Sequence, residues 1–333
     1  MKKTRCALCY AVIAVCFALL LAVSVGTGSA ALSPHEILRV LLLREGAGTA
    51  AYNVLLKIRL PRVLAAAVMG GTLSVSGFLL QTFFRNPIAG PYVLGVSSGA
   101  KLAVGAVMIF GMKLWGCVPF GAVMTAAFVG AMLCASFVMI VSRKIHSMAM
   151  LLVVGMMIGN VCSAATDFFV TFAKESDIAN LTSWSMGSFS AVSWGNLRIC
   201  LAVIAVCLLL AKPVGAYQFG EHYAASMGVN VRRFRAALIG LSCLLAACVT
   251  ALVGPISFVG IAVPYMTKKL LGTAKPMAVL PGCFLLGGVF CMACDWIART
   301  AFSPTELAIS TVTAFFGAPV VIVMALKRGG GHR

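Results

Sequence analysis

Acidic residues are scarce in this chain, with only 8 Asp and Glu against 26 Lys and Arg in 333 residues. Charged residues of both signs make up 10% of the sequence, and hydrophobic residues make up 61%. A soluble globular domain carries about 25% charged residues, so an ordinary soluble enzyme is excluded and an integral membrane protein is indicated. The net charge of +18 fits basic loops beside anionic headgroups, so we expect membrane lipid as a partner and no nucleic acid.

Motifs for nucleotide hydrolysis and metal catalysis are also missing. No Gly-x-x-x-x-Gly-Lys-Ser/Thr loop and no His-Glu-x-x-His element occurs, and the four histidines are scattered. Among the 13 cysteines, the pairs Cys6 with Cys9 and Cys291 with Cys294 have metal-ligand spacing, but neither has a second Cys or His pair nearby. We therefore predict no catalytic residue, no metal site and no cofactor.

Long apolar runs bounded by Pro, Gly or charge are the main feature that is present. At about 20 residues per span, the chain has room for about ten transmembrane helices and for no large soluble domain. The sequence predicts an all-α integral membrane protein with a single domain, residues 1–333. The candidate spans are residues 6–28, 61–82, 92–112, 117–142, 147–173, 195–212, 235–254, 256–271, 277–298 and 305–326.

Some candidate spans are interrupted, at Gly254-Pro255 and at Gly317-Ala318-Pro319. Membrane proteins tolerate such breaks where the backbone is buried in protein or lines a cavity. Ala66, Gly70 and Ser74 recur every fourth residue, with Gly77 one turn further on, which predicts close helix packing. Residues 33–43 begin with Ser-Pro and carry apolar residues at helical spacing, so we expect a short helix on the outer surface.

Lys and Arg gather in the loops on one side when the N-terminus is placed inside and the spans alternate. The positive-inside rule therefore predicts that both termini are cytoplasmic. The longest cytoplasmic loop, residues 212–235, contains a segment typical of a short helix ended by Gly228. This segment is either a solvated connection or a docking helix for a soluble partner, and the residues alone leave both open.

Short motifs rich in Gly, Pro and Arg follow one another along nearly the whole chain. They are Arg59-Leu60-Pro61-Arg62, Gly77 with Gln81, Asn-Pro-Ile-Ala-Gly-Pro at 86–91, Leu-Gly-Val-Ser-Ser-Gly-Ala at 94–100, Gly187-Ser188 with Trp194, residues 220–228, Gly-Pro-Ile-Ser-Phe-Val-Gly at 254–260 with Pro264, Leu280-Pro281-Gly282, Asp295 to Arg299, and Gly317-Ala318-Pro319. This ordered series resembles the FecCD-type family, the permease subunits of ABC importers for vitamin B12, haem and iron siderophores.

The resemblance implies the fold of a type II ABC importer permease in the cell inner membrane, with no covalent chemistry of its own. It implies a second permease copy in a homodimer, two cytoplasmic ABC ATPase subunits, and a periplasmic or lipid-anchored substrate-binding protein. The family's ATPase-coupling helix corresponds to residues 221–228. We therefore expect ATPase contacts at Glu221, Ala224, Met227 and Gly228.

The family's outer arginines, which receive acidic residues of the binding protein, correspond to Arg59, Arg62 and Arg299. The topology independently places these three outside, and the planar guanidinium suits carboxylates. The alternative is that Arg59 and Arg62 anchor a helix end at the headgroups and that Arg299 pairs with Asp295 one turn earlier.

The turn between the fourth and fifth spans lies at the family's cytoplasmic gate, so the resemblance assigns His146 and Ser147 to the gate, and Asn86 and Pro87 to the pathway. The alternative for this basic turn is a purely topogenic role. Lys101 and Asp167 lie within apolar segments and are either functional or structurally paired.

Two departures from the family pattern concern the pathway. Pro264-Tyr265 with Lys268-Lys269 replaces the usual Pro-His and Arg, and residues 306–310 lack the Pro and Gly that usually open the last helix, so we expect a straighter start there. An ion-coupled secondary transporter is the alternative function, but Asp167, Asp295 and Glu306 are few and close to helix ends. The sequence leaves open which cargo is carried, a siderophore, haem or a corrinoid, and whether the second permease copy is identical.

Overall fold

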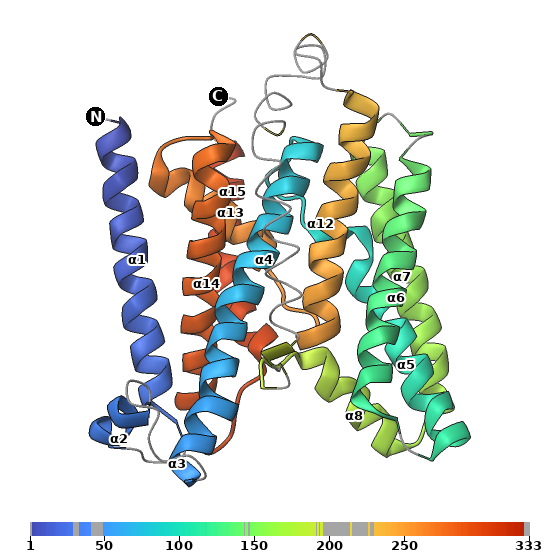
Figure 1. The fold of residues 1–333 in the computed structure, drawn as a ribbon. Helices are drawn as coiled ribbons and strands as arrows, with labels where there is room; N and C mark the ends of the chain where they lie inside the picture. The colour runs from blue at the N-terminus through green and yellow to red at the C-terminus, as the bar shows by residue number, and fades with distance from the viewer. Residues whose placement is uncertain are drawn as a thin grey trace.

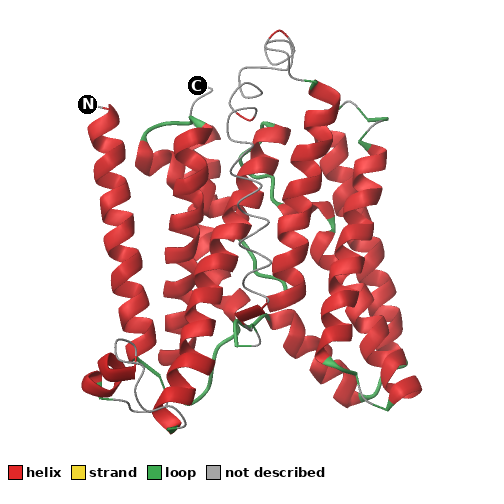
Figure 2. Cartoon of the chain, in the orientation of Figure 1, coloured by secondary structure: helices red, strands yellow, loops and turns green. Residues whose placement is uncertain are grey.

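The fold is known from a computed structural model that describes residues 2–28, 33–40, 49–116, 118–142, 144–145, 147–190, 192, 194–195, 214, 226 and 230–329. Within these residues all regular secondary structure is helical (Figure 2), as predicted. Apart from Gly195, the predicted span 195–212 lies outside the described residues.

The helices follow most of the predicted spans in position, but the last one begins at Ile309, so residues 306–308 of its expected start are not helical. In order they are α1 (Lys2–Gly26), α2 (Pro34–Leu38), α3 (Ala50–Asn53), the π-helical turn η2 (Val54–Arg59), α4 (Leu60–Phe84), the 3-10 turn η3 (Pro91–Leu94), α5 (Val96–Trp115), α6 (Phe120–Val141), α7 (Met148–Thr171), α8 (Glu175–Met186), α12 (Val231–Val253), α13 (Val259–Leu271), α14 (Pro276–Thr300) and α15 (Ile309–Gly329).

Seven helical segments of the described chain are long and apolar enough to cross a membrane. They lie in α1, in the stretch from α3 to α4, and in α6, α7, α12, α14 and α15. Helix α5 holds a shorter apolar stretch, Val96–Gly111. Helix α13 has 13 residues, which at 1.5 Å per residue extend only about 20 Å. Since Gly254 ends α12 with a positive φ of 85°, the predicted break at Gly254-Pro255 is confirmed.

The second break does not interrupt the helix, because α15 continues through Gly317-Ala318-Pro319. A β-carbon on Gly317 would lie 2.5 Å from that of Phe258, so this glycine serves close packing between α15 and the start of α13. Helix α8 was not predicted. Its 12 residues, which include Glu175 and Asp177, form no apolar run that would reveal a helix.

The predicted span 61–82 begins earlier than expected, because α3, η2 and α4 form one continuous helix from Ala50 to Phe84. Pro61 has no N–H to donate to the carbonyl five residues earlier, that of Leu56, which a π-helical turn would pair with it. The indole Nε1 of Trp194 donates to this carbonyl instead, at 3.2 Å. The π turn and the distant Trp together explain how a helix passes through the proline.

Helix α4 lies at the centre of the bundle and packs against α14, α12, α13 and α1 (Figure 1). In its most apolar stretch 94% of the residues are buried, against 6% in α1 at the edge. The start of α1 and the end of α15 lie at the same end of the bundle, which we call the termini end (Figure 1). Helices α2, α3 and α8 lie at the opposite end.

The predicted small-residue face of α4 is the surface along which the backbones approach. A β-carbon on Gly70 would lie 2.4 Å from the carbonyl oxygen of Gly287 in α14, and one on Gly77 would lie 1.7 Å from that of Gly260 in α13. On another side of α4, Ser76 and Ser242 of α12 exchange hydrogen bonds, each hydroxyl donating to the other residue's carbonyl at 2.7 and 2.8 Å.

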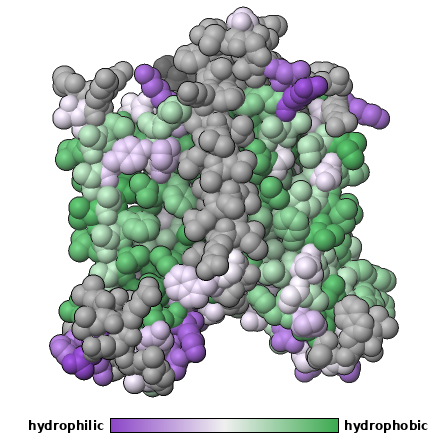
Figure 3. Space-filling view, viewed as in Figure 1, coloured by the Kyte–Doolittle hydropathy of each residue, from purple (hydrophilic) through white to green (hydrophobic). Residues whose placement is uncertain are grey.

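On the face seen in Figure 3, hydrophobic residues form a band between two more polar ends. The short helix expected within residues 33–43 is present as α2, which begins at Pro34 after the cap Ser33 and ends at Leu38, while residues 41–43 lie outside the described residues. The backbone N–H and hydroxyl of Ser33 both donate to the Glu36 carboxylate. These hydrogen bonds lower the pKa of Glu36.

Gly77→Ala is expected to lower stability, since its methyl group would overlap the Gly260 backbone and force α4 and α13 apart. Overpacking of this kind costs about 1–3 kcal/mol. Gly240→Ala in α12 is the matched control, because no atom lies within 4 Å of the added β-carbon. The measurement is the thermal unfolding midpoint of the purified protein in detergent. Equal midpoints for the two variants would contradict this packing.

Candidate functional site at the opposite end of the bundle

Five charged residues from three parts of the chain meet at the opposite end of the bundle, and we call them the arginine cluster. Arg59 ends η2, Arg62 lies in the first turn of α4, Asp295 and Arg299 lie near the end of α14, and Glu306 lies in the loop before α15. Arg62 and Arg299 come together because α4 and α14 run antiparallel beside each other (Figure 1).

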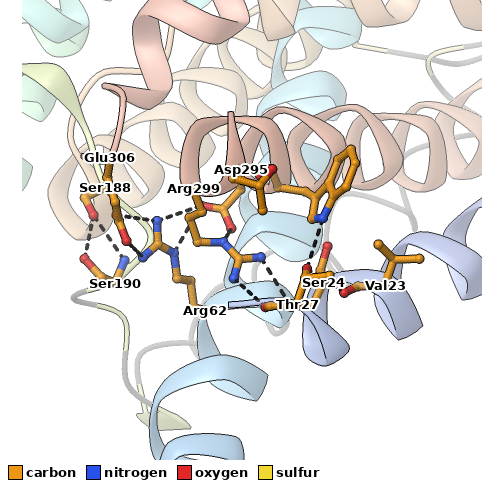
Figure 4. Close-up of polar contacts among 11 residues, drawn as sticks. Val23, Ser24, Thr27, Arg62, Ser188, Ser190, Asp295, Arg299 and Glu306 are labelled. Carbon is orange, nitrogen blue, oxygen red and sulfur yellow. Dashed lines mark hydrogen bonds and ion pairs between the residues drawn. The ribbon is translucent and has the colours of Figure 1, made fainter. Parts of the chain in front are cut away.

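Asp295 is the centre of the cluster. Its Oδ1 accepts a hydrogen bond from Nε of Arg62 at 3.1 Å, and its Oδ2 accepts from Nε of Arg299 at 3.0 Å. Figure 4 shows the carboxylate between the two guanidinium groups. Asp295 is only 2% exposed, so its charge depends on these two partners rather than on water.

Glu306 binds the other edge of Arg62. The Nη1 and Nη2 atoms of Arg62 donate to Oε1 and Oε2 of Glu306 at 3.1 and 2.9 Å, which makes the pair bidentate. The Glu306 side chain is 53% exposed, whereas that of Arg62 is 12% exposed. Arg62 therefore links a buried carboxylate to one that faces solvent.

The other two arginines bind the end of α1. Arg299 donates to the carbonyls of Ser24 and Thr27 at 3.3 and 3.4 Å, and Arg59 donates to those of Val25 and Gly26 at 3.0 and 3.3 Å. The last carbonyls of a helix have no partner within it, and cations there interact favourably with the helix dipole. Arg59 is only 5% exposed, so its guanidinium serves this end of α1 from within the protein.

The structure brings together all three arginines that the resemblance named, with two carboxylates among them. Arg299 pairs with Asp295 one turn earlier, which is the pairing that the sequence offered as the alternative. Their role in docking remains a prediction. The part of Glu306 was missed. The sequence signals only that acidic residues are rare and that this one lies near the helix ends that carry the arginines, and neither signal names its partner.

The predicted pathway residues at the termini end lie in turns. After α4, the backbone N–H of Ile88 donates to the Asn86 side chain at 3.1 Å, and Pro87 lies between them. Ser147 caps α7, its hydroxyl accepting from the N–H of Met150. His146 and the predicted coupling residues Glu221, Ala224, Met227 and Gly228 lie outside the described residues.

A polar stripe runs along α7 within its apolar sequence. Asn160, Ser163 and Asp167 are exposed, and their spacing of three and four residues puts them on one helix face. An adjacent stripe exposes large apolar side chains, including Val161 and Phe168. Since an ionisable side chain within a membrane span faces a protein interior or a water-filled cavity, the polar stripe is the candidate lining of a pathway.

Across the described ranges, no three His, Cys, Asp or Glu side chains are grouped so that they could hold a metal ion. Cys291 and Cys294 are buried as free thiols. The charged groups that the described residues do bring together are arginines and carboxylates in ion pairs.

Comparisons with known proteins give one consistent result. The model of the FecCD transport family matches residues 15–327. The haemin transport system permease HmuU of Yersinia pestis is 33% identical over 317 residues, which are 94% of this chain and 95% of the relative. The vitamin B12 import permease BtuC of Yersinia pseudotuberculosis is 34% identical over 278 residues, 82% of each chain.

Solved structures agree. An inward-facing structure described as a metal-chelate type ABC transporter is 27% identical, with a TM-score of 0.83 over 96% of this chain and 99% of that one. PsaBC from Streptococcus pneumoniae in complex with Fab, at 18% identity and a TM-score of 0.52 over 79% of this chain and 90% of that one, supports the fold alone.

The two carboxylates of the cluster are expected to differ in their effect on stability. Asp295→Asn leaves two arginines without their buried counter-ion, which costs about 3–5 kcal/mol. Glu306→Gln removes an ion pair at the surface, which costs at most about 1 kcal/mol. Thermal unfolding of the two variants in detergent measures the difference. If Glu306→Gln lowers the unfolding midpoint as much as Asp295→Asn does, burial does not determine how much each ion pair contributes to stability.

Proposed function

Because the chain belongs to the FecCD transport family, we propose that it forms the import pathway for a metal chelate, either an iron siderophore, haem or a corrinoid. The chain is the membrane-spanning permease subunit of an ABC importer, and ATP hydrolysis resides in a separate subunit. The observation that carries the cargo class is the similarity, over 94% and 82% of this chain, to permeases named for haemin and vitamin B12.

We propose that the termini end faces the cytoplasm and that the arginine cluster faces outward. The positive-inside rule supports this orientation, because the described basic residues at the termini end outnumber those at the opposite end. The basic residues at the termini end are Arg5, Arg85, Lys144, Arg233, Arg235, Lys268, Lys269, Lys275 and Lys327.

We further propose that a second copy of the permease completes the pathway across α7. The exposed Asn160, Ser163 and Asp167 support this, because a polar stripe facing lipid would be costly. The neighbouring apolar stripe of α7 would meet lipid or the second copy. In this arrangement Asp167 lies in the pathway.

On the cytoplasmic side we propose that residues 221–228 dock two ABC ATPase subunits and that the turn with His146 and Ser147 belongs to the gate, with Asn86 and Pro87 in the adjoining turn. The coupling segment directly precedes α12, whose first turn is capped by Asn230. A force on that segment would therefore be delivered to a helix that packs against α4 and α6.

On the outer side we propose that a substrate-binding protein docks at the arginine cluster through its acidic residues. Arg59, Arg62 and Arg299 converge there, and guanidinium groups bind carboxylates in a bidentate geometry. Arg62 is the most accessible candidate, because its side chain is 12% exposed, against 7% for that of Arg299 and 5% for Arg59 as a whole residue.

The test reconstitutes the permease in proteoliposomes with its ATPase and with binding protein loaded with ferric siderophore, haemin or cobalamin. One cargo should accumulate inside only with ATP and the binding protein. Ala224→Asp should lower both ATPase copurification and uptake at least about tenfold, because an unpaired charge in an apolar interface is costly.

Gly121→Asp is the control for this experiment, because its added β-carbon meets no atom within 4 Å and it lies in the first turn of α6 at the opposite end. Its uptake should match that of the unmodified permease. Uptake that follows an ion gradient without ATP would favour the secondary transporter instead. Full uptake by Ala224→Asp would contradict ATPase docking at residues 221–228 and would indicate that this segment is only a connection.

Docking is tested by reversing one charge. Arg62→Glu should weaken the affinity of the binding protein for the reconstituted permease at least about tenfold, because like charges across an interface repel. Arg62→Lys should have a smaller effect, since charge remains while the bidentate geometry is lost. A binding protein with one acidic residue changed to Lys should restore docking to Arg62→Glu.

The matched control is Lys174→Glu, an exposed charge reversal beside α8 at the same end. Binding should remain close to that of the unmodified permease. If Arg62→Glu and Lys174→Glu lower the affinity equally, only the overall charge of this end matters. The proposed contact at Arg62 would then be contradicted.

A further inference from the structure

The two carboxylates on Arg62 are held very differently. Asp295 belongs to α14, is almost fully buried and accepts hydrogen bonds from two arginines. Glu306 belongs to a loop, and the only partner of its carboxylate among the described residues is Arg62. One carboxylate is thus fixed by its surroundings, and the other is held by a single ion pair at the surface.

We propose that Arg62 is the receptor for one acidic side chain of the binding protein and that Glu306 occupies this receptor until the binding protein docks. The inference rests on the docking proposed above and adds the group that is displaced. Asp295 stays in place and holds the Arg62 guanidinium in position for the exchange.

The exchange conserves the chemistry of the site. The incoming carboxylate takes the two hydrogen bonds from Nη1 and Nη2 that Glu306 now accepts at 3.1 and 2.9 Å. Displaced Glu306 returns to water, which already covers half of its side chain. Because exposed ion pairs contribute little, the displacement should cost no more than about a factor of 5 in affinity.

The loop geometry lets Glu306 leave without unravelling its neighbours. The next residue, Leu307, donates its backbone N–H to the carbonyl of Ala298 at 2.9 Å. Ser310, in the first turn of α15, donates its hydroxyl to the carbonyl of Met186 at 2.8 Å. Because the residues that follow Glu306 are tied to α14 and α8, rotation of the Glu306 side chain is sufficient.

Glu306 also sets the charge that an approaching partner meets. While it is bound, the two carboxylates offset two of the three arginines in the cluster. Its movement away from Arg62 adds positive charge where the partner's carboxylate arrives. Glu306 therefore competes with any partner surface for Arg62. Only a partner carboxylate that reaches both Nη atoms of Arg62 displaces it.

The experiment measures the affinity of the binding protein for the permease and ATPase complex in lipid nanodiscs. Glu306→Gln should bind about three- to fivefold more tightly, because the amide competes for Arg62 without a charge. Glu306→Asp keeps the charge on a shorter side chain. Its affinity for the binding protein should lie between that of the unmodified permease and that of Glu306→Gln. The gain should shrink as salt is raised.

Glu175→Gln is the matched control, because Glu175 is an exposed acid in the first turn of α8 at the same end. It removes the same charge without touching Arg62, so its affinity should change less than twofold. An affinity for Glu306→Gln equal to that of this control, or weaker than that of the unmodified permease, would overturn the exchange.

The Arg62→Glu variant separates the two proposals. If it abolishes docking while Glu306→Gln gains nothing, docking at Arg62 stands and the exchange fails. If Arg62→Glu binds normally, the docking site itself is wrong and the exchange falls with it. A thermal unfolding midpoint for Glu306→Gln close to that of the unmodified protein assigns any change in affinity to the interface.

Discussion

The near-complete enclosure of α4 by its neighbours is the constraint on which the rest of the structure depends. Helices α13 and α14 reach it at distances that only glycine allows, at Gly77 with Gly260 and at Gly70 with Gly287. Because such contacts leave no room for side chains, the three helices hold a fixed register. That register places the first turn of α4 beside the last turns of α14, and Arg62 thereby meets Asp295. The arginine cluster is a consequence of backbone packing that begins several turns away.

Burial then decides how each charge of the cluster behaves. In a medium of low dielectric, Asp295 needs both of its arginines, whereas the ion pair of the half-exposed Glu306 contributes little, because water can replace its protein partner. Arg59 and Arg299 have different partners, since they donate hydrogen bonds to carbonyls at the end of α1 that have no partner within that helix. The cluster therefore contains two arginines that also bind the end of α1, and one, Arg62, whose second edge binds a half-exposed carboxylate. The proposed docking contact is therefore at Arg62, where the buried charge of Asp295 already compensates for the desolvation of the guanidinium.

The sequence predicted the fold class and most spans because apolar runs and their Gly and Pro boundaries report membrane helices directly. It predicted the packing face of α4 from Gly70, Ser74 and Gly77, since small residues at helical spacing let two helix backbones approach closely. It missed α8, whose polar residues look like a loop, and the passage of the helix through Pro61, which depends on Trp194 from far along the chain. It also could not tell that Glu306 reaches Arg62, because a pairing across 244 positions is set by tertiary structure. The three arginines were found through the motif, but which of them are buried followed only from the fold.

Helix α1 shows how arginines compensate for weak enclosure. It lies at the edge of the bundle with few buried residues, so apolar packing alone holds it loosely. At the termini end, Arg5 donates to the carbonyls of Lys269 and Leu270 at the end of α13. At the opposite end, Arg59 and Arg299 bind the carbonyls of α1 itself. Each of these contacts joins a charged donor to carbonyls at a helix end, where the backbone has no partner of its own and the dipole favours a cation. Because Arg299 also binds Asp295, a disturbance of the buried carboxylate reaches α1, whereas a disturbance of Glu306 ends at Arg62.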